Sequence, residues 1–256
     1  MKKSVIFLFF FFFTTFAFVA QEENLRNRDY RIKAGFLIGG TTPMPLPAEI
    51  RKIEGFNPLL NLMIGAEVRQ SLHENWSLLS GLQFEVKGME TRAQVKNYNL
   101  TMVSDDDGEI SGAFTGTVRT RVKNSYLTLP LLAMWQPDRE SKWGIKAGVY
   151  GSFLLDGEFN GSTYDGYLRE GDPTGERIDI TTASYEFSKE LRRWNWGALL
   201  GAEWRPFPNL LTGIDLSWGI NSILKKDFDV ISYNMYPIYG TVSFGYLFSK
   251  DKIIIN

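Results

Sequence analysis

Apolar and polar residues alternate along several stretches of this chain, most clearly over residues 194–205. Trp194, Trp196 and Trp204 share one register with alanine and leucine, whereas the other register carries small or charged residues such as Glu203. Successive side chains of a strand point to opposite faces, so the pattern predicts a strand with one apolar, aromatic face and one polar face. Tryptophans near both ends of such a face are typical of a strand that meets lipid.

The same alternation predicts eight strands, counting the one above. Their approximate ranges are 31–40, 59–70, 76–88, a segment ending with 126–135, 143–156, 194–205, 210–221 and 237–248. The connections alternate in length: long at 41–58, 89–117, 157–182 and 222–236, and short at 71–75, 136–141 and 206–209. This asymmetry is typical of outer-membrane barrels, and an even strand count brings both termini to the short-turn side. The predicted fold class is therefore all-β: an eight-stranded antiparallel transmembrane up-and-down β-barrel with long extracellular loops and short periplasmic turns.

Two of the long connections carry further signals. Four prolines, Pro43, Pro45, Pro47 and Pro58, argue against a central strand over 41–58 and predict a loop there. The acidic run 104–109 marks a loop tip, so the strands on either side of it are expected to extend beyond the membrane as a hairpin.

The N-terminus predicts a signal peptide over residues 1–20. A basic start is followed by an apolar core with five consecutive phenylalanines, and Ala20 precedes a polar stretch. An uncleaved anchor is the alternative, but the apolar run is shorter than the roughly 20 residues a spanning helix needs. We expect a short periplasmic lead over 21–30, the barrel over 31–248 and a C-terminal tail over 249–256. Phe248 would then serve as the terminal aromatic for the barrel-assembly machinery.

The two faces of the predicted strands assign two sets of residues. The lipid-facing girdle is expected to contain all seven tryptophans: Trp76, Trp135, Trp143, Trp194, Trp196, Trp204 and Trp218. The lumen of an eight-stranded barrel is only wide enough for side chains to fill, so charges inside it must pair. We predict a salt-bridged plug made by Lys33, Glu67, Arg69, Glu85, Lys87, Lys146, Asp156, Arg193, Glu203, Arg205 and Asp215. A charge-lined pathway for small solutes is the alternative.

Composition narrows the chemistry. The net charge of −1 gives no basis for nucleic-acid binding, and the absence of cysteine excludes disulfides, thiol nucleophiles and cysteine-based zinc sites. The single histidine, His73, falls in a predicted short turn, which argues against a serine triad or histidine metal site at the outer rim. The tip Asp105–Asp107 lacks the ligand spacing of an EF-hand, because Val103 and Phe114 occupy two of its ligand positions. We therefore expect no enzymatic activity, cofactor or metal.

The segment 158–167 interleaves aromatic residues with small polar ones. Phe159, Tyr164 and Tyr167 are candidates for loop recognition, since tyrosine offers a large contact area at low entropic cost. A loop cap packed on itself is the equally open alternative.

The motif Tyr126-Leu127-Thr128-Leu129-Pro130-Leu131-Leu132, with Lys33-Ala34-Gly35 in the first strand and Gly245-Tyr246-Leu247-Phe248 in the last, resembles the PorT-like outer-membrane β-barrel family of Bacteroidetes. The resemblance covers the whole predicted mature chain and supplies no catalytic residues. It implies residence in the bacterial outer membrane, in contact with its lipid. The expected function is structural or surface-interacting, and the alternative is an accessory role in a protein secretion complex. A rim-located membrane hydrolase is a further candidate, against which the misplaced His73 argues.

Overall fold

The computed structural model describes residues 28–248, apart from 105–107, 139, 172, 229 and 231–232. The expected signal peptide, the first part of the expected lead, the C-terminal tail and the three aspartates of the acidic tip all lie outside the described residues. The described elements are β1 Arg28–Pro43, β2 Ile50–Pro58, β3 Leu62–Ser71, β4 Trp76–Ser104, β5 Gly108–Trp135, β6 Trp143–Glu170, β7 Arg177–Glu186, η2 Ser188–Glu190, β8 Trp194–Phe207, β9 Leu210–Gly219 and β10 Met235–Phe248. No helix in this part of the chain is long and apolar enough to cross a membrane.

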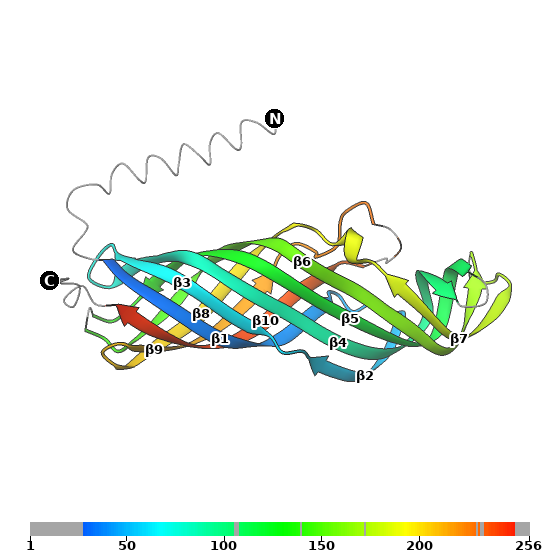
Figure 1. Cartoon of the computed structure of the whole chain (residues 1–256), viewed down its shortest axis with the longest axis horizontal. Helices are drawn as coiled ribbons and strands as arrows, with labels where there is room; N and C mark the ends of the chain where they lie inside the picture. Colours follow the sequence, from blue (N-terminus) through cyan, green and yellow to red (C-terminus); the bar gives the residue numbers. More distant parts are fainter. Residues whose placement is uncertain are drawn as a thin grey trace, which may run out of the picture.

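Eight of these strands close into one antiparallel ring in the order β1-β3-β4-β5-β6-β8-β9-β10, and β10 pairs with β1 to complete it. The closing pair runs in continuous register from Tyr30 opposite Phe248 to Pro43 opposite Met235. β1 starts and β10 ends at the same end of the ring, where the short turns also lie (Figure 1). The predicted fold class is confirmed, and β1 begins three residues earlier than expected.

Within the ring, exposure alternates as the sequence predicts. On β8, Trp194, Trp196 and Trp204 are exposed while Asn195 and Glu203 are buried. The inside of the ring is polar and its outside apolar, which is the arrangement that a lipid environment requires.

Three strands are much longer than the ring needs. β4, β5 and β6 continue past it, and β4 and β5 stay paired as far as Ser104 opposite Gly108, with one register shift between Val95 and Tyr98. The expected long hairpin is thus confirmed. The expectation of a loop over 157–182 is wrong, because this segment forms the far half of β6, a turn and the start of β7.

β7 joins the long strands into a second, smaller ring. It pairs with β6 along Asn160–Arg169 and returns to β4 at Val103 and Ser104. Strands β4, β5, β6 and β7 therefore enclose a space of their own beyond the first ring, and we call this part the extension (Figure 1). We call the eight-stranded ring the membrane ring. It and the extension lie end to end along the long axis of the molecule (Figure 1).

The expected loop over 41–58 also contains a strand. β2 pairs only with β4, along residues 89–95 of that strand, from Ile50 opposite Val95 to Pro58 opposite Met89. Its other edge has no partner strand in the described structure. Proline is tolerated on such an edge because a missing N–H breaks no ladder bond there, so the prolines excluded a central strand but not an edge strand.

A β-bulge decides which way part of β6 faces. The register shifts between Ser125 opposite Asp156 and Tyr126 opposite Leu154, which leaves one extra residue on β6. One extra residue sends every later side chain to the opposite face. Lys146 points inward before the bulge, but Asp156 after it is exposed and Phe159 is buried.

Candidate functional site

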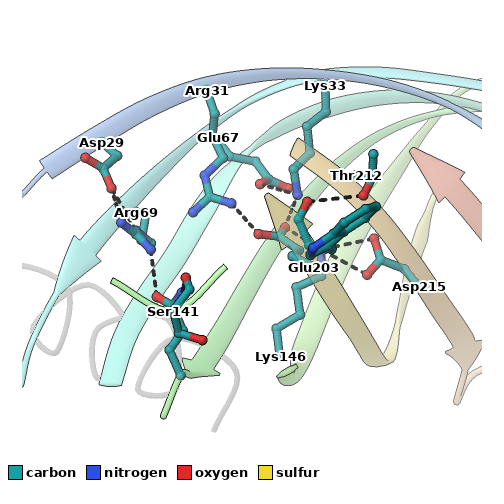
Figure 2. Close-up of polar contacts among 12 residues, drawn as sticks. Asp29, Arg31, Lys33, Glu67, Arg69, Ser141, Lys146, Glu203, Thr212 and Asp215 are labelled. Atoms are coloured by element: carbon teal, nitrogen blue, oxygen red, sulfur yellow. Dashed lines mark hydrogen bonds and ion pairs between the residues drawn. The ribbon is translucent and has the colours of Figure 1, made fainter. Parts of the chain in front are cut away.

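The interior of the membrane ring holds a compact network of ion pairs centred on Glu203 of β8 (Figure 2). Arg31 Nη1 lies 2.6 Å from Glu203 Oε2, Lys146 Nζ lies 2.9 Å from Glu203 Oε1, and Lys33 also contacts this carboxylate. All four side chains are almost completely buried. A carboxylate with three cationic partners needs further anions nearby for charge balance.

Those anions are Glu67 of β3 and Asp215 of β9. Lys33 Nζ lies 2.9 Å from Glu67 Oε2, and Lys146 Nζ lies 2.9 Å from Asp215 Oδ1. The three cations of the network therefore face three carboxylates, from five different strands of the ring. Buried charges are stable only when they are paired and hydrogen-bonded, and this network meets that condition. It confirms pairing for the predicted residues Lys33, Glu67, Lys146, Glu203 and Asp215.

A second ion pair lies nearer the short-turn end. The Arg69 guanidinium contacts the Asp29 carboxylate and donates a hydrogen bond of 2.8 Å to Gln136 Oε1. Sequence analysis named Arg69 but missed both Asp29 and Arg31. The signal was present, since Asp29 and Arg31 share the inward register of Lys33; the strand was expected to begin only at Arg31.

The other end of the network is closed by an aromatic cage around Lys87. Its Nζ lies 2.8 Å from Glu85 Oε2 and 5.4–5.9 Å from the ring centroids of Tyr126, Tyr150 and Tyr239. Cations are attracted to the faces of aromatic rings, most strongly where water is excluded. This layer separates the charged interior of the membrane ring from the apolar interior of the extension.

Three predicted members do not join the network. Asp156 is exposed because the bulge in β6 turns it outward, and Arg193 is exposed because it precedes the first residue of β8. Arg205 is half-buried beside Arg31 and Arg69, around a small cavity of about 20 Å³, and no ion pair is found for it among the described residues.

The extension has a different interior. Its buried residues form one apolar cluster that includes Phe114, Val118, Phe159 and Leu168. Ile223 and Leu224, from the connection between β9 and β10, complete the cluster from the side of the ring. An interior of this kind closes the space above the charged network against water.

Tyrosine hydroxyls supply the polar contacts in this cluster. Tyr98 and Tyr233 share a hydrogen bond of 2.5 Å between their hydroxyl oxygens, and Tyr185 donates one of 3.1 Å to the Arg119 carbonyl. Burial raises the pKa of Tyr233 to about 12 and raises the pKa of Tyr98 well above its ordinary value. Both hydroxyls therefore stay protonated at neutral pH, and the bond between them persists.

The three candidate recognition residues have different positions. Phe159 is 1 % exposed in the apolar cluster, so its assignment to a recognition surface is wrong: the segment is part of β6, not a loop, and Phe159 packs inside the extension. Tyr164 and Tyr167 are half-buried. The ring of Tyr167 lies 4.4 Å from the Arg177 guanidinium and 5.7 Å from that of Arg169, which holds it rigidly near the end of the β6–β7 hairpin.

The tryptophans lie on the outside of the ring, as expected. Trp76 pairs with Trp135 and Trp143 pairs with Trp204, which places four of them together at the short-turn end. Trp194, Trp196 and Trp218 lie toward the other end of the ring. Trp194 and Trp204 are ten residues apart on β8, and ten residues rise about 25 Å across a membrane at ~3.3 Å per residue and a tilt of ~40°. This separation matches the apolar band of an outer-membrane barrel.

The described residues include no group of three or more histidines and carboxylates that could hold a metal ion. His73 is exposed in the turn between β3 and β4. The buried charged groups of the network are paired with one another, and these ion pairs connect strands across the interior of the ring. Together, the closed antiparallel ring, its apolar outer band and its charged interior define a small transmembrane β-barrel.

A family model supports this class. The model of the outer membrane protein beta-barrel domain matches residues 19–225, well over half of the chain. The chain belongs to this family and is a protein of the bacterial outer membrane. A search of curated proteins finds no match.

Solved structures to which the chain is similar include three proteins of other bacteria. Ail, the attachment invasion locus protein of Yersinia pestis, is 11% identical over 87% of this chain and 99% of its own, with a TM-score of 0.37. Neisserial surface protein A is 12% identical over 86% of this chain and 97% of its own (TM-score 0.31), and OprG from Pseudomonas aeruginosa is 14% identical over 87% and 97% (TM-score 0.33). At these values the likenesses carry no conclusion about activity or ligand.

Proposed function

We propose that this protein is a non-enzymatic surface-interaction barrel, in which a closed membrane ring holds the extension at the outer surface of the cell. The observation that carries the proposal is the contrast between a ring interior filled by paired side chains and a long projection built of paired strands. The network around Glu203 and the cage around Lys87 fill the membrane ring. Three strands then continue beyond the ring for a length that sealing the membrane does not need.

The surface we assign to recognition is the end of the β6–β7 hairpin. Tyr164 and Tyr167 remain partly exposed there, and Arg177 pairs with Asp179 at 2.7 Å beside them. Rigid tyrosines next to arginine supply contact area at little entropic cost, which suits a protein partner.

The orientation is part of the proposal: both termini and the short turns face the periplasm, and the extension faces outward. The chain has no cysteine, so a single introduced cysteine is a unique label. We expect Thr181→Cys in β7 to react with a membrane-impermeant maleimide on intact cells, and His73→Cys in the β3–β4 turn to react only after the outer membrane is opened. The reverse result would contradict the proposed orientation and place the extension in the periplasm.

A second candidate, an accessory role in a secretion complex, is supported by the resemblance to PorT-like proteins. Site-specific photocrosslinking separates the two candidates. A photoreactive residue at Tyr164 should capture a surface partner if the first proposal holds. Capture only from His73, at the short-turn end, would favour a periplasmic secretion partner and would count against the hairpin as the recognition surface.

Two further alternatives have direct tests. In planar bilayers the reconstituted protein should give no steady conductance, because paired side chains fill the lumen; stable open steps would support a small-solute channel. Purified protein should show no esterase or protease turnover above that of a Ser141→Ala, His73→Ala control. Turnover abolished by one substitution would revive the rim hydrolase.

A further inference from the structure

The barrel wall has a gap between β1 and β2, at the end of the membrane ring that adjoins the extension. The ladder between β1 and β3 ends at Phe36 opposite Leu62, followed by one bond from Leu37 N–H to the Asn61 carbonyl. Beyond this point β1 continues to Pro43 beside β10, while β2 takes up the edge of β4. No register joins β1 to β2, so the two edges face each other without a ladder.

The sequence explains why this gap stays open. Pro43, the last residue of β1, lacks the N–H group that a β1–β2 ladder would need there, and Pro45 and Pro47 lie in the connection between the two strands. The Thr41 N–H, on the free edge of β1, donates instead to Met89 Sδ at 3.2 Å. The Met89 side chain therefore accepts the hydrogen bond that the backbone of a neighbouring strand would otherwise accept.

A cavity of about 400 Å³ lies behind this gap. Its back wall is made by buried residues of the extension, including Met89, Val118 and Phe159. Its exposed lining residues are Leu46, Ile53 and Phe56, all on the segment that leaves β1 and forms β2. The volume falls in the range of about 300–1,000 Å³ that small-molecule sites occupy.

The cavity is continuous with the lipid-facing surface of the ring. Gly40, Thr42 and Ile238 line it and lie in the outward register of β1 and β10, the register of Ile38, which is 65 % exposed. Ile238 also pairs with Trp218 of the aromatic girdle. The outer face of β1 therefore leads from the lipid-facing surface of the ring to the lining of the cavity.

Phe56 covers the mouth, beside the buried Met89. A Cβ placed on Gly40 would lie 2.7 Å from Met89 Sδ and 2.9 Å from Phe56 Cε2, so these side chains rest directly on the β1 backbone. Glycine at this position is what lets them approach. Phe56 is half-exposed on an edge strand, which leaves it free to swing aside.

The lining decides the chemistry of the occupant. It contains no charged residue, and its polar atoms are threonine hydroxyls, tyrosine hydroxyls and backbone groups. A charged ligand would lose its hydration here and find no charged side chain to offset that loss. We propose that this cavity is a binding site for a single acyl chain, which enters sideways from the outer membrane through the gap between β1 and β2, with any headgroup left at the mouth.

The test is photocrosslinking in vesicles of phosphatidylcholine that contain the full-length barrel. One arm uses free dodecanoic acid with a diazirine near its methyl end, and the other uses phosphatidylcholine with the same diazirine chain. Peptide mass spectrometry then locates the label. We expect it on the buried residues Met89, Val118 or Phe159; the arm that gives it identifies a free fatty acid or a membrane lipid as the source.

Three variants make the result decisive. Ala93→Trp fills the cavity from β4 and should reduce labelling of the buried residues by about tenfold, which corresponds to about 1.4 kcal/mol of lost binding. Ala198→Trp, on the lipid-facing side of β8, is the matched control and should leave it unchanged. Phe56→Ala should increase it by opening the mouth. Heat-modifiable migration verifies that each variant is folded.

Two outcomes would overturn the proposal. One is label confined to lipid-facing residues such as Leu129 and Ile214 in both arms, with the cavity residues unmodified. The other is equal labelling of the cavity residues in Ala93→Trp and in the control. Either result is independent of whether the hairpin tip binds a protein partner.

Discussion

The membrane ring and the extension share continuous strands but have opposite polarity. On β5 the outward residues change from Arg119, Arg121 and Lys123 in the extension to Leu127, Leu129 and Leu131 in the ring. The inward residues change in the opposite sense, from Val118 and Val122 to Thr128. One continuous strand, β5, thus carries two inside-out arrangements, because the solvent outside it changes from water to lipid.

The place of this change defines the membrane boundary. It falls between Lys123 and Leu127 on β5, at the level where the cage around Lys87 separates charged interior from apolar interior. Below that level stability rests on ion pairs inside the ring, and above it on apolar packing inside the extension. Substitutions in the two regions should therefore destabilise different parts of the protein.

The largest effect is expected from breaking the charged interior. Glu203→Gln removes the carboxylate shared by three cations and should lower the free energy of unfolding in detergent micelles by about 3–5 kcal/mol. Urea titration followed by heat-modifiable migration measures it. Glu158→Gln, which loses a mostly exposed pair with Arg121, is the control and should cost under about 1 kcal/mol. A small loss for Glu203→Gln would mean that the network is not sealed from water.

The next effect is expected in the extension alone. Phe114 is 0 % exposed, and Phe114→Ala should destabilise the apolar cluster by about 3–5 kcal/mol. Because the membrane ring has its own interior, we expect trypsin to cut within the extension while the remaining barrel keeps its heat-modifiable migration. Loss of both together would show that ring and extension unfold as one unit.

The sharpest comparison uses two outward positions of one strand. Leu129→Arg places a charge on the lipid face and should cost about 2–4 kcal/mol in lipid vesicles. Arg121→Leu, eight residues earlier in the same register, should change stability by less than about 0.5 kcal/mol. Equal costs at the two positions would place the membrane boundary elsewhere.

Sequence patterning was sufficient for the ring. Alternation is a local property, and it assigned the lipid face and most of the charged network, including Lys33, Lys146 and Glu203, to the correct sides. It failed at Asp156, because one bulged residue reversed the register of β6 between Asp156 and the ring. It also failed for residues 157–182, where an apolar inside and a polar outside were interpreted as a loop.

The sequence by itself therefore determined the eight strands of the ring, the fold class and the apolar girdle, since each follows from periodicity and from the lengths of the connections. Only the tertiary structure decided which charges meet, where the face of the sheet inverts and where the wall parts between β1 and β2. These features depend on pairings between residues far apart in the chain, such as Arg31 with Glu203 and Ser125 with Asp156. A pattern read along one strand carries no information about the register of its neighbours.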